Sequence, residues 1–450
     1  MKTFTLTVLL LILLLTAVHT YSQTWNELGA GLNGPVTTIY PYKTDVYVGG
    51  YFFDAGGHDD ADFLARWDGC EWHAVASGLN ATVSTIAVSG DTVYVAGNFT
   101  DVGGNADIDG IAYWDGTHWN NLGTGLDYYV TDMIVFGGEL YVGGGFNGTS
   151  DGQYACLVAK WDGASWHALG SGPSFCAYDF AYVSDMATAG TDLYVVGLFY
   201  DMGGVPAADR VARWDGVSWH SLGLGIDDGP LWYDDLHIEI DHQDIYVSGA
   251  FTNAGGNDNA DYLVKWDGND WHGLSESLAD SNTSRITLFD NNLYCSIYRP
   301  DLGMSIITLW NAQLETWEIL DSISSIIPMI ADSNNIYIGG YFEEINGEST
   351  PHIARWGEVV DCTSALKSEI KVPSIEIHAY PNPAHDILYF STEEKNFESY
   401  NIEVSDMTGK VLIEIKSNER QLNTSSLALG VYTLQMQTKE RIGIVKFNKY

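Results

Sequence analysis

The sequence predicts an all-β protein made of a seven-bladed β-propeller followed by a smaller C-terminal β module. Three observations support this fold class: a Trp-centred unit present in seven copies, a Tyr-Val-x-Gly column between the copies, and a change of charge late in the chain. A fixed period of roughly 40 to 50 residues is typical of propellers and solenoids. The 450 residues allow a large core and more than one domain.

The recurring unit reads Ala-Arg-Trp-Asp-Gly in its first copy. Its leading Trp occupies seven positions: Trp67, Trp114, Trp161, Trp214, Trp266, Trp310 and Trp356. Asp-Gly follows the first five of these directly, and a second Trp closes each of those five units. Because Asp and Gly tolerate the backbone angles of tight turns, each unit predicts two short strands joined by a hairpin turn.

The Tyr-Val-x-Gly column lies between these units and carries a Phe two residues after its Gly. Its Tyr occurs at Tyr47, Tyr94, Tyr141, Tyr194, Tyr246 and Tyr337, and a degenerate copy at Tyr294 lacks the Gly and Phe. Each repeat resolves into four antiparallel strands, which in the first repeat are expected at 36–42, 46–52, 63–67 and 72–75. Seven such repeats predict seven blades.

The two ends of the repeat array complement each other. The last unit, at Trp356, has no following Trp strand, whereas the chain near its start has an orphan strand beginning at Trp25. We expect the Trp25 strand to complete the last blade and close the ring, which would remove an exposed sheet edge.

Charge and targeting signals divide the chain into segments. Residues 23–362 carry 9 basic and 48 acidic side chains, whereas residues 363–450 carry 10 and 11. Such an acidic body argues against nucleic acid or an anionic membrane as partner. The apolar run 6–17 after Lys2 is typical of a signal peptide. The expected segments are a signal peptide (1–22), the propeller (23–360), a linker (361–374) and a final module (375–450), with no transmembrane segment after signal cleavage.

The final module combines Pro381-Asn382-Pro383 with Gly430, Tyr432 and Lys446. In these motifs it resembles the type A C-terminal sorting domain of proteins exported by the type IX secretion system of Bacteroidetes. The resemblance implies a small, Ig-like β-sandwich that the outer-membrane translocon recognises and a sorting protease removes. It also implies a protein that crosses the outer membrane and is then extracellular or anchored at the cell surface.

The Trp-Asp-Gly units of residues 25–358 resemble those of secreted kelch-like and galactose-oxidase-like propellers. Two departures limit what this resemblance implies. The double glycine of kelch repeats precedes the Tyr, whereas Gly49-Gly50 follow Tyr47 here, and Asp and Gly are adjacent rather than separated as in the Asp box of sialidases. No catalytic residue is therefore carried over, and none is predicted.

Acidic loops between the second and third strands are candidates for Ca²⁺, because oxygen ligands at alternate positions suit this ion. The candidate ligands are Asp59, Asp60, Asp62, Asp107, Asp109, Asp258 and Asp261. Since the EF-hand spacing is absent, the simpler interpretation is solvating surface charge. The five cysteines form no framework; Cys156 and Cys176 could pair across adjacent repeats, but the spacing does not decide this.

Aromatic and acidic side chains also gather in the loops that lead into the inner strands of three consecutive central blades. These candidate ligand-binding residues are Tyr128, Tyr129, Phe175, Tyr178, Trp232, Tyr233, Asp234 and Asp235. Such a rim suits glycan stacking or a protein partner, although the rings could instead pack among neighbouring loops. The sequence thus favours a surface binding or adhesion module. The alternative is a secreted polysaccharide hydrolase or lyase that uses rim carboxylates.

Overall fold

The computed structural model describes two parts of the chain. The first covers residues 24–357 apart from 151, 174–175, 177–180, 227–235, 275–282, 300, 313 and 346. The second covers 377–380, 387–392, 400–405, 411–417, 421–428, 430–437 and 442–449. The predicted signal peptide and linker lie outside these ranges. Contacts divide the chain into two compact units, Met1–Val360 and Asp361–Tyr450, and each is described by itself.

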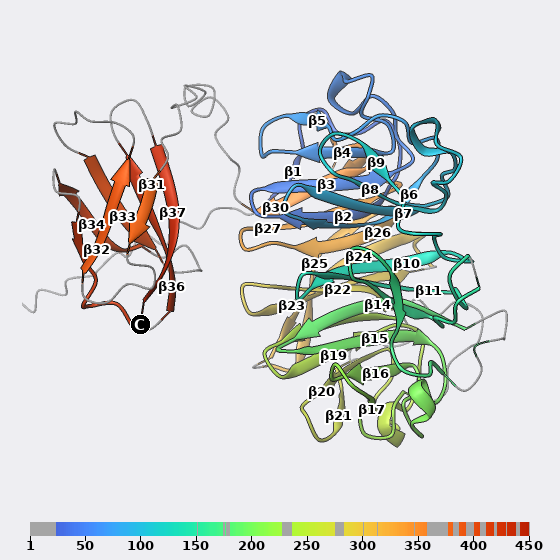
Figure 1. Cartoon of the computed structure of the whole chain (residues 1–450). Helices are drawn as coiled ribbons and strands as arrows, with labels where there is room; N and C mark the ends of the chain where they lie inside the picture. Colours follow the sequence, from blue (N-terminus) through green and yellow to red (C-terminus); the bar gives the residue numbers. More distant parts are fainter. Residues whose placement is uncertain are drawn as a thin grey trace, which may run out of the picture. The chain divides into compact units, whose positions relative to one another are not determined.

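The first unit is a propeller of seven four-stranded antiparallel sheets (Figure 1). Blade 1 contains β2 (Val36–Tyr42), β3 (Asp45–Gly50), β4 (Leu64–Trp67) and β5 (Trp72–Ala74). Blade 2 contains β6 (Val83–Ser89), β7 (Thr92–Gly97), β8 (Ile111–Trp114) and β9 (Trp119–Asn120). Blade 3 contains β10 (Val130–Phe136), β11 (Glu139–Gly144), β12 (Val158–Trp161) and β13 (Trp166–Ala168).

The next three blades continue in chain order. Blade 4 contains β14 (Tyr182–Ala189), β15 (Asp192–Leu198), β16 (Val211–Trp214) and β17 (Trp219–Ser221). Blade 5 contains β18 (His237–Asp241), β19 (Asp244–Ser248), β20 (Leu263–Trp266) and β21 (Trp271–Gly273). Blade 6 contains β22 (Thr283–Phe289), β23 (Asn292–Arg299), β24 (Met304–Asn311) and β25 (Thr316–Ile323).

Blade 7 is built from both ends of the propeller. It contains β26 (Ile326–Ala331), β27 (Asn335–Gly340), β30 (Ile353–Gly357) and, as its outer strand, β1 (Trp25–Glu27). Trp25 lies opposite Trp356 in this pairing. A small hairpin, β28 (Glu344–Ile345) with β29 (Glu348–Ser349), precedes β30. Inner strands of consecutive blades contact one another, and β26 contacts β2, so the ring is closed.

In blades 1 to 6, the Trp column attaches the blade to the chain that leads into it. The second Trp of a hairpin donates its indole N–H to a carbonyl of the preceding connector, as in Trp72 to Leu28 O at 2.9 Å and Trp219 to Leu169 O at 2.7 Å. The same bond recurs at Trp119, Trp166, Trp271 and Trp317. A buried indole N–H needs such a partner, which explains why the position is Trp.

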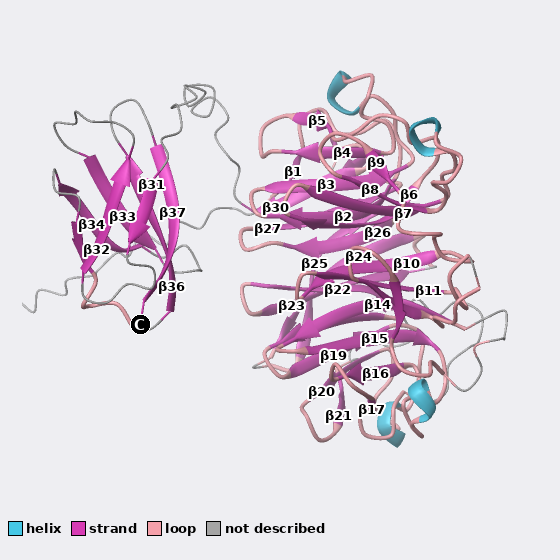
Figure 2. Ribbon diagram, in the orientation of Figure 1, coloured by secondary structure: helices cyan, strands magenta, loops and turns pink. Residues whose placement is uncertain are grey.

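Phe and Gly complete the repeat. The six Phe side chains of the Tyr-Val-x-Gly column are 0–1% exposed and fill the blade cores: Phe52, Phe99, Phe146, Phe199, Phe251 and Phe342. Four blades add a short 3₁₀ turn in the loop between their second and third strands (Figure 2). These turns are η1 (Ala55–Gly57), η2 (Val102–Gly104), η3 (Met202–Gly204) and η4 (Ala254–Gly256). Each follows a residue in the left-handed conformation.

The second unit consists of two antiparallel sheets with a common core. One sheet contains β31 (Ile377–Tyr380), β32 (Ile387–Thr392) and β35 (Gln421–Asn423). The other contains β34 (Val411–Ser417), β33 (Tyr400–Ser405), β36 (Gly430–Gln437) and β37 (Ile442–Lys449). Leu388 and Phe390 of the first sheet pack with Ile402 and Leu434 of the second. The predicted fold class, a seven-bladed propeller followed by a small β-sandwich, is confirmed.

Two further features are the membrane-spanning potential of the helices and a disulfide bond in the propeller. Within the described part of the chain, no helix is long and apolar enough to cross a membrane. Cys156 and Cys176, whose pairing the sequence left undecided, form a disulfide with their Cα atoms 5.9 Å apart. This bond joins a loop of blade 3 to the connector that leads into blade 4.

Candidate functional site in the central channel

The seven inner strands surround a cavity of about 660 Å³. Six of them (all but β18) carry an irregularity in register near their start, as between Val130 and Asp132 in β10. A bulge re-aims the side chains that follow it. The residue after the bulge lines the cavity in β2, β6, β10, β14 and β22: Thr38, Thr85, Asp132, Asp185 and Arg285.

Hydroxyl groups at the bulges join neighbouring blades. Thr37 Oγ1 contacts Val83 O of blade 2 at 2.6 Å and Gly49 O of its own blade at 3.2 Å. Ser184 repeats this arrangement with Leu236 O at 2.7 Å. These bonds hold the inner strands in a fixed relation, so the channel lining is rigid scaffold rather than mobile loop.

The lining is charged on one arc of the ring only. Blades 1 and 2 contribute Thr38 and Thr85, whereas blades 3, 4 and 5 contribute Asp132, Asp185 and Glu239. The seven blades repeat the same scaffold, so a departure confined to consecutive blades is a functional signal in its own right. These residues are not recognisable from the sequence, because they lie in apolar inner strands, which are typical of a core, and not in loops, where binding residues are usually found.

Each aspartate also accepts a backbone hydrogen bond from the next blade. Asp132 Oδ2 accepts from Met186 N at 2.9 Å, and Asp185 Oδ2 accepts from Ile238 N at 3.0 Å. Burial raises the pKa of Asp132, and the neighbouring Asp185 raises it further.

Glu239 is a third carboxyl group in the cavity. Burial, followed by the charge of Asp185, raises the pKa of Glu239 to about 8, and a hydrogen bond with Thr287 opposes this shift. A carboxyl group with such a pKa is largely protonated at neutral pH and can donate a hydrogen bond. The cavity therefore offers both donors and acceptors from its carboxyl groups.

Arg285 and His237 add a basic side to the cluster. Arg285 Nη1 lies 2.7 Å from His237 Nδ1, and Arg285 Nε donates to Ile327 O at 2.7 Å. The side chain of His237 is buried. His237 Nδ1 also lies 3.3 Å from Asp185 Oδ2. Guanidinium, imidazole and carboxylate thus form one continuous polar network.

Two predicted rim residues lie at the mouth of this cavity. Tyr128 and Tyr129 are 62% and 45% exposed, their rings are 4.7 Å apart, and Tyr129 lines the cavity. Gly145 leaves room for Tyr129, because a Cβ atom at that position would lie 2.7 Å from its ring. The other predicted rim residues, Phe175, Tyr178, Trp232, Tyr233, Asp234 and Asp235, fall outside the described residues.

The predicted calcium ligands have two different positions. Asp62, Asp109 and Asp261 accept a backbone N–H eight residues earlier, at Asp54, Asp101 and Asn253, with distances of 2.8–3.0 Å. Asp59, Asp60, Asp107 and Asp258 are exposed. In the described ranges, no group of three or more His, Cys, Asp or Glu side chains is placed to hold a metal ion. Calcium binding by these loops stays the less favoured interpretation, beside solvating surface charge.

The recurring histidines beside the second Trp belong to the hairpin turns. His73 Nε2 lies 2.6 Å from Asp68 Oδ2, and the pairs His167–Asp162, His220–Asp215 and His272–Asp267 repeat this contact at 2.6–2.9 Å. Backbone N–H groups of the turn, with Ser165 first, and the imidazole of His167 lower the pKa of Asp162 to about 2. These histidines stabilise separate turns and form no common site.

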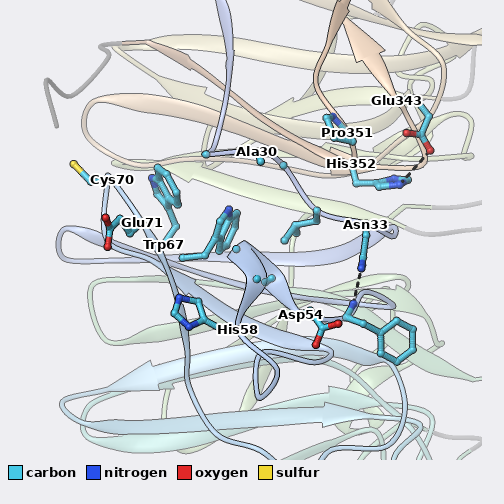
Figure 3. Close-up of a pocket in the computed structure, with 18 residues that line it drawn as sticks. Ala30, Asn33, Asp54, His58, Trp67, Cys70, Glu71, Glu343, Pro351 and His352 are labelled. Atoms are coloured by element: carbon cyan, nitrogen blue, oxygen red, sulfur yellow. Dashed lines mark hydrogen bonds and ion pairs between the residues drawn. The ribbon is translucent and has the colours of Figure 1, made fainter. Parts of the chain in front are cut away.

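A larger cavity, of about 790 Å³, lies where blade 7 meets blade 1. Figure 3 shows it between the connector at Ala30–Asn33, the η1 loop with His58, and Glu343 and His352 of blade 7. The Trp67 and Trp72 side chains that border it are 4% and 3% exposed, so they pack rather than present a binding surface. We therefore place the candidate site in the channel, where carboxyl groups of three consecutive blades line one cavity.

The sorting residues are described only in part. Tyr432 is buried and its hydroxyl donates to Ala428 O at 2.9 Å, four residues earlier. Gly430 begins β36, and Lys446 lies in β37 opposite Thr433. Pro381, Asn382 and Pro383 lie outside the described residues. The hydrogen bond of its hydroxyl group gives Tyr432 a structural role within the sandwich.

Comparison with known proteins identifies the C-terminal module. Residues 378–448 match the family described as "Secretion system C-terminal sorting domain". No curated protein matches the chain. The kelch-like resemblance of the propeller repeats stays a prediction.

Three solved structures are similar to the chain at low identity and with TM-scores below 0.5. The extracellular domain of a hybrid two component system from B. thetaiotaomicron is 11% identical, with a TM-score of 0.44, 95% of this chain covered and 57% of that one. PorZ, a surface component of the type-IX secretion system of Porphyromonas gingivalis, is 12% identical, with a TM-score of 0.35 and coverages of 92% and 66%.

The β-propeller domain of the Trilobed protease from Pyrococcus furiosus is 8% identical, with a TM-score of 0.42 and coverages of 75% and 99%. The chain spans less than two thirds of the length of the two component system domain and of PorZ. At these identities and TM-scores, none of the three similarities indicates a ligand or an activity for this chain.

Proposed function

We propose that this exported protein, which its type IX sorting domain directs across the outer membrane to the cell surface, is a binding module for glycans or surface proteins. In this proposal the ligand enters the central channel along the arc formed by blades 3 to 5. The main support is the cluster of Asp132, Asp185 and Glu239, which departs from the repeated scaffold on consecutive blades only.

The chemistry of the channel suits a ligand rich in hydroxyl or amide groups. Carboxyl groups that donate and accept, next to an arginine, recognise such groups by paired hydrogen bonds. Tyr128 and Tyr129 at the mouth provide exposed aromatic faces on which a sugar ring can stack. A cavity of about 660 Å³ lies within the usual size of small-ligand sites.

The alternative is a polysaccharide hydrolase or lyase. Glycoside hydrolysis uses two carboxyl groups about 5 Å or more apart, with the substrate between them. Glu239, with its raised pKa, is the residue that could serve as an acid in this alternative.

The test is retention of the mature protein on a panel of immobilised bacterial and host polysaccharides, with release of reducing sugar and unsaturated product followed on the same panel. We expect retention without turnover, and we expect Tyr129→Ala to weaken it at least tenfold. Tyr298→Ala is the matched control, because Tyr298 of blade 6 is 43% exposed.

Retention that survives Tyr129→Ala and Asp185→Asn alike would place the ligand elsewhere. Turnover that is lost in Glu239→Gln would favour the enzyme. Far-UV circular dichroism and the melting temperature of each variant would confirm that the propeller is folded.

A further inference from the structure

Blade 6 differs from every other blade in its outer strand. The outer strands of the other six blades, β5, β9, β13, β17, β21 and β1, contain two or three residues each, whereas β25 contains eight. Short edge strands are one of the ways in which natural proteins avoid pairing with other chains. The propeller uses this protection in six blades and not in blade 6.

The degenerate repeat explains why β25 is long. In blade 6, Tyr294 is not followed by the Gly and Phe that the other repeats carry after their Tyr. Blade 6 also has no 3₁₀ loop among its described residues. A tight turn instead joins β23 and β24, closed by the bond from Gly303 N to Arg299 O at 2.9 Å. The two strands are therefore long, and β25 pairs with β24 from Asn311–Thr316 to Ser305–Ile323.

The connector after β25 is correspondingly short. Only residues 324 and 325 separate β25 from the inner strand of blade 7, whereas 75–82 separate β5 from β6. In the other blades an irregular connector leads from the outer strand to the next blade, whereas in blade 6 the corresponding residues belong to β25. In the described part of the chain, no strand pairs with the outer edge of β25.

The side chains of β25 give this edge its character. Trp317 packs inward on Trp310, with ring centroids 5.1 Å apart, and Ile323 is buried. Between them, Ile319 is 65% exposed and Leu320 is 37% exposed. Glu318 is exposed as well. Since neighbouring residues of a strand point to opposite faces, Glu318 and Ile319 present an acidic face and an apolar face.

We propose that the outer edge of β25 binds an extended segment of a partner protein as a fifth strand of blade 6, and that this segment alternates basic with apolar residues. Exposed sheet edges bind extended segments through main-chain hydrogen bonds, while alternate side chains set specificity. A basic residue would face Glu318 and an apolar one would cover Ile319. The alternation follows from the two faces of β25.

The charge of the propeller decides between a partner and a second copy. Residues 23–362 carry 39 more acidic than basic side chains, so two copies repel each other, whereas a basic segment is attracted. The register irregularity between Ile307 and Thr308 leaves Leu320 out of the ladder and limits the straight run to 316–319. A segment of about four to six residues is therefore the fitting size.

The test uses the mature full-length protein and a fluorescent, end-blocked eight-residue peptide that alternates Val and Lys. Anisotropy measures its affinity, and hydrogen exchange measures protection of 316–323. A peptide of the same sequence, N-methylated at every residue, keeps the charge but has no N–H group on either edge with which to pair as a strand. An alternating Val and Glu peptide reverses the charge. We expect only the unmodified Val and Lys peptide to bind and to protect β25.

Ile319→Lys places a charge on the apolar face and should weaken binding at least tenfold. Val217→Lys is the matched control, because Val217 is 83% exposed in the β16–β17 turn and the charge change is the same. Equal binding of the N-methylated peptide, or equal loss in both variants, would reduce the effect to charge attraction and overturn the proposal. Self-association of the free protein that Ile319→Lys abolishes would make the occupant a second copy instead.

Discussion

Trp67 and Trp72 are neighbours in one hairpin, with ring centroids 5.2 Å apart, yet their indole N–H groups have different environments. Trp72 donates to Leu28 O, whereas Trp67 Nε1 is buried and has no protein hydrogen-bond partner among the described residues. A buried donor without a partner costs free energy, and a bonded one stabilises the fold. A comparison of substitutions at these two positions therefore distinguishes the contribution of the hydrogen bond from that of ring packing.

We expect Trp72→Phe to lower the free energy of unfolding by about 1–3 kcal/mol more than Trp67→Phe does. Both substitutions remove a similar part of the ring, but only the first leaves the Leu28 carbonyl without its donor. Urea unfolding followed by circular dichroism measures the difference. Equal losses would show that the Trp column acts through packing alone.

Glu239 links the channel to pH. Its pKa is raised from 4.5 to about 8, so the folded state binds this proton more tightly than the unfolded chain. Such a group destabilises the fold as the pH rises above 4.5, and the penalty is complete above about 8. At pH below 4.5 the group is protonated in both states and has no effect.

We therefore expect Glu239→Gln to raise the melting temperature by about 3 °C or more at pH 9 and to leave it nearly unchanged at pH 4.5. Thermal unfolding of both proteins across this range checks the prediction. Glu139→Gln on blade 3 is a control, because Glu139 is partly exposed and bonds Lys160 at 3.0 Å. A gain of equal size at both pH values would contradict the assignment.

The aspartates of the 3₁₀ loops have a structural role, because they close the loops by hydrogen bonds to the backbone. In each described loop an aspartate accepts the N–H of the left-handed residue eight positions earlier, as Asp109 does for Asp101 at 2.9 Å. Sequence reasoning identified the acidic pattern but not this loop closure, because the bond depends on a positive φ that the chain adopts only after folding.

We expect millimolar Ca²⁺ to leave the melting temperature of the EDTA-treated protein unchanged. The carboxylates of Asp62, Asp109 and Asp261 already accept backbone bonds, and their acidic neighbours are spread over the surface. A rise with Ca²⁺ that Mg²⁺ does not reproduce would instead assign these loops to a metal site.

The elements were the part of the fold most accessible from sequence. Blade 1 was expected at 36–42, 46–52, 63–67 and 72–75, and its strands end within two residues of those bounds. Repetition made this possible, since seven copies average out local ambiguity. The channel charges were not accessible, because Asp132 and Asp185 occur once each and their convergence depends on the closed ring.

The whole propeller depends on the pairing of β1 with β30. Without β1, the last blade would have three strands and an exposed edge at Ile353–Gly357. We expect deletion of residues 24–27 to lower the melting temperature by about 10 °C or more and to promote aggregation. Deletion of residues 361–450 is the control, and we expect it to leave propeller unfolding unchanged because the two units are separately compact. Differential scanning calorimetry and light scattering measure both effects, and an unchanged transition after β1 deletion would contradict the role of this strand.

The joining of the first and last strands also sets an order of events in time. Trp25 is made before the other strands of the propeller, and its partner Trp356 follows more than three hundred residues later. Contacts between such distant segments form slowly, and an unclosed ring exposes the edges of its terminal blade. The chain therefore stays in an open, pairing-competent state until almost the whole propeller exists, and anything that holds either end of the ring during export also controls when folding is complete.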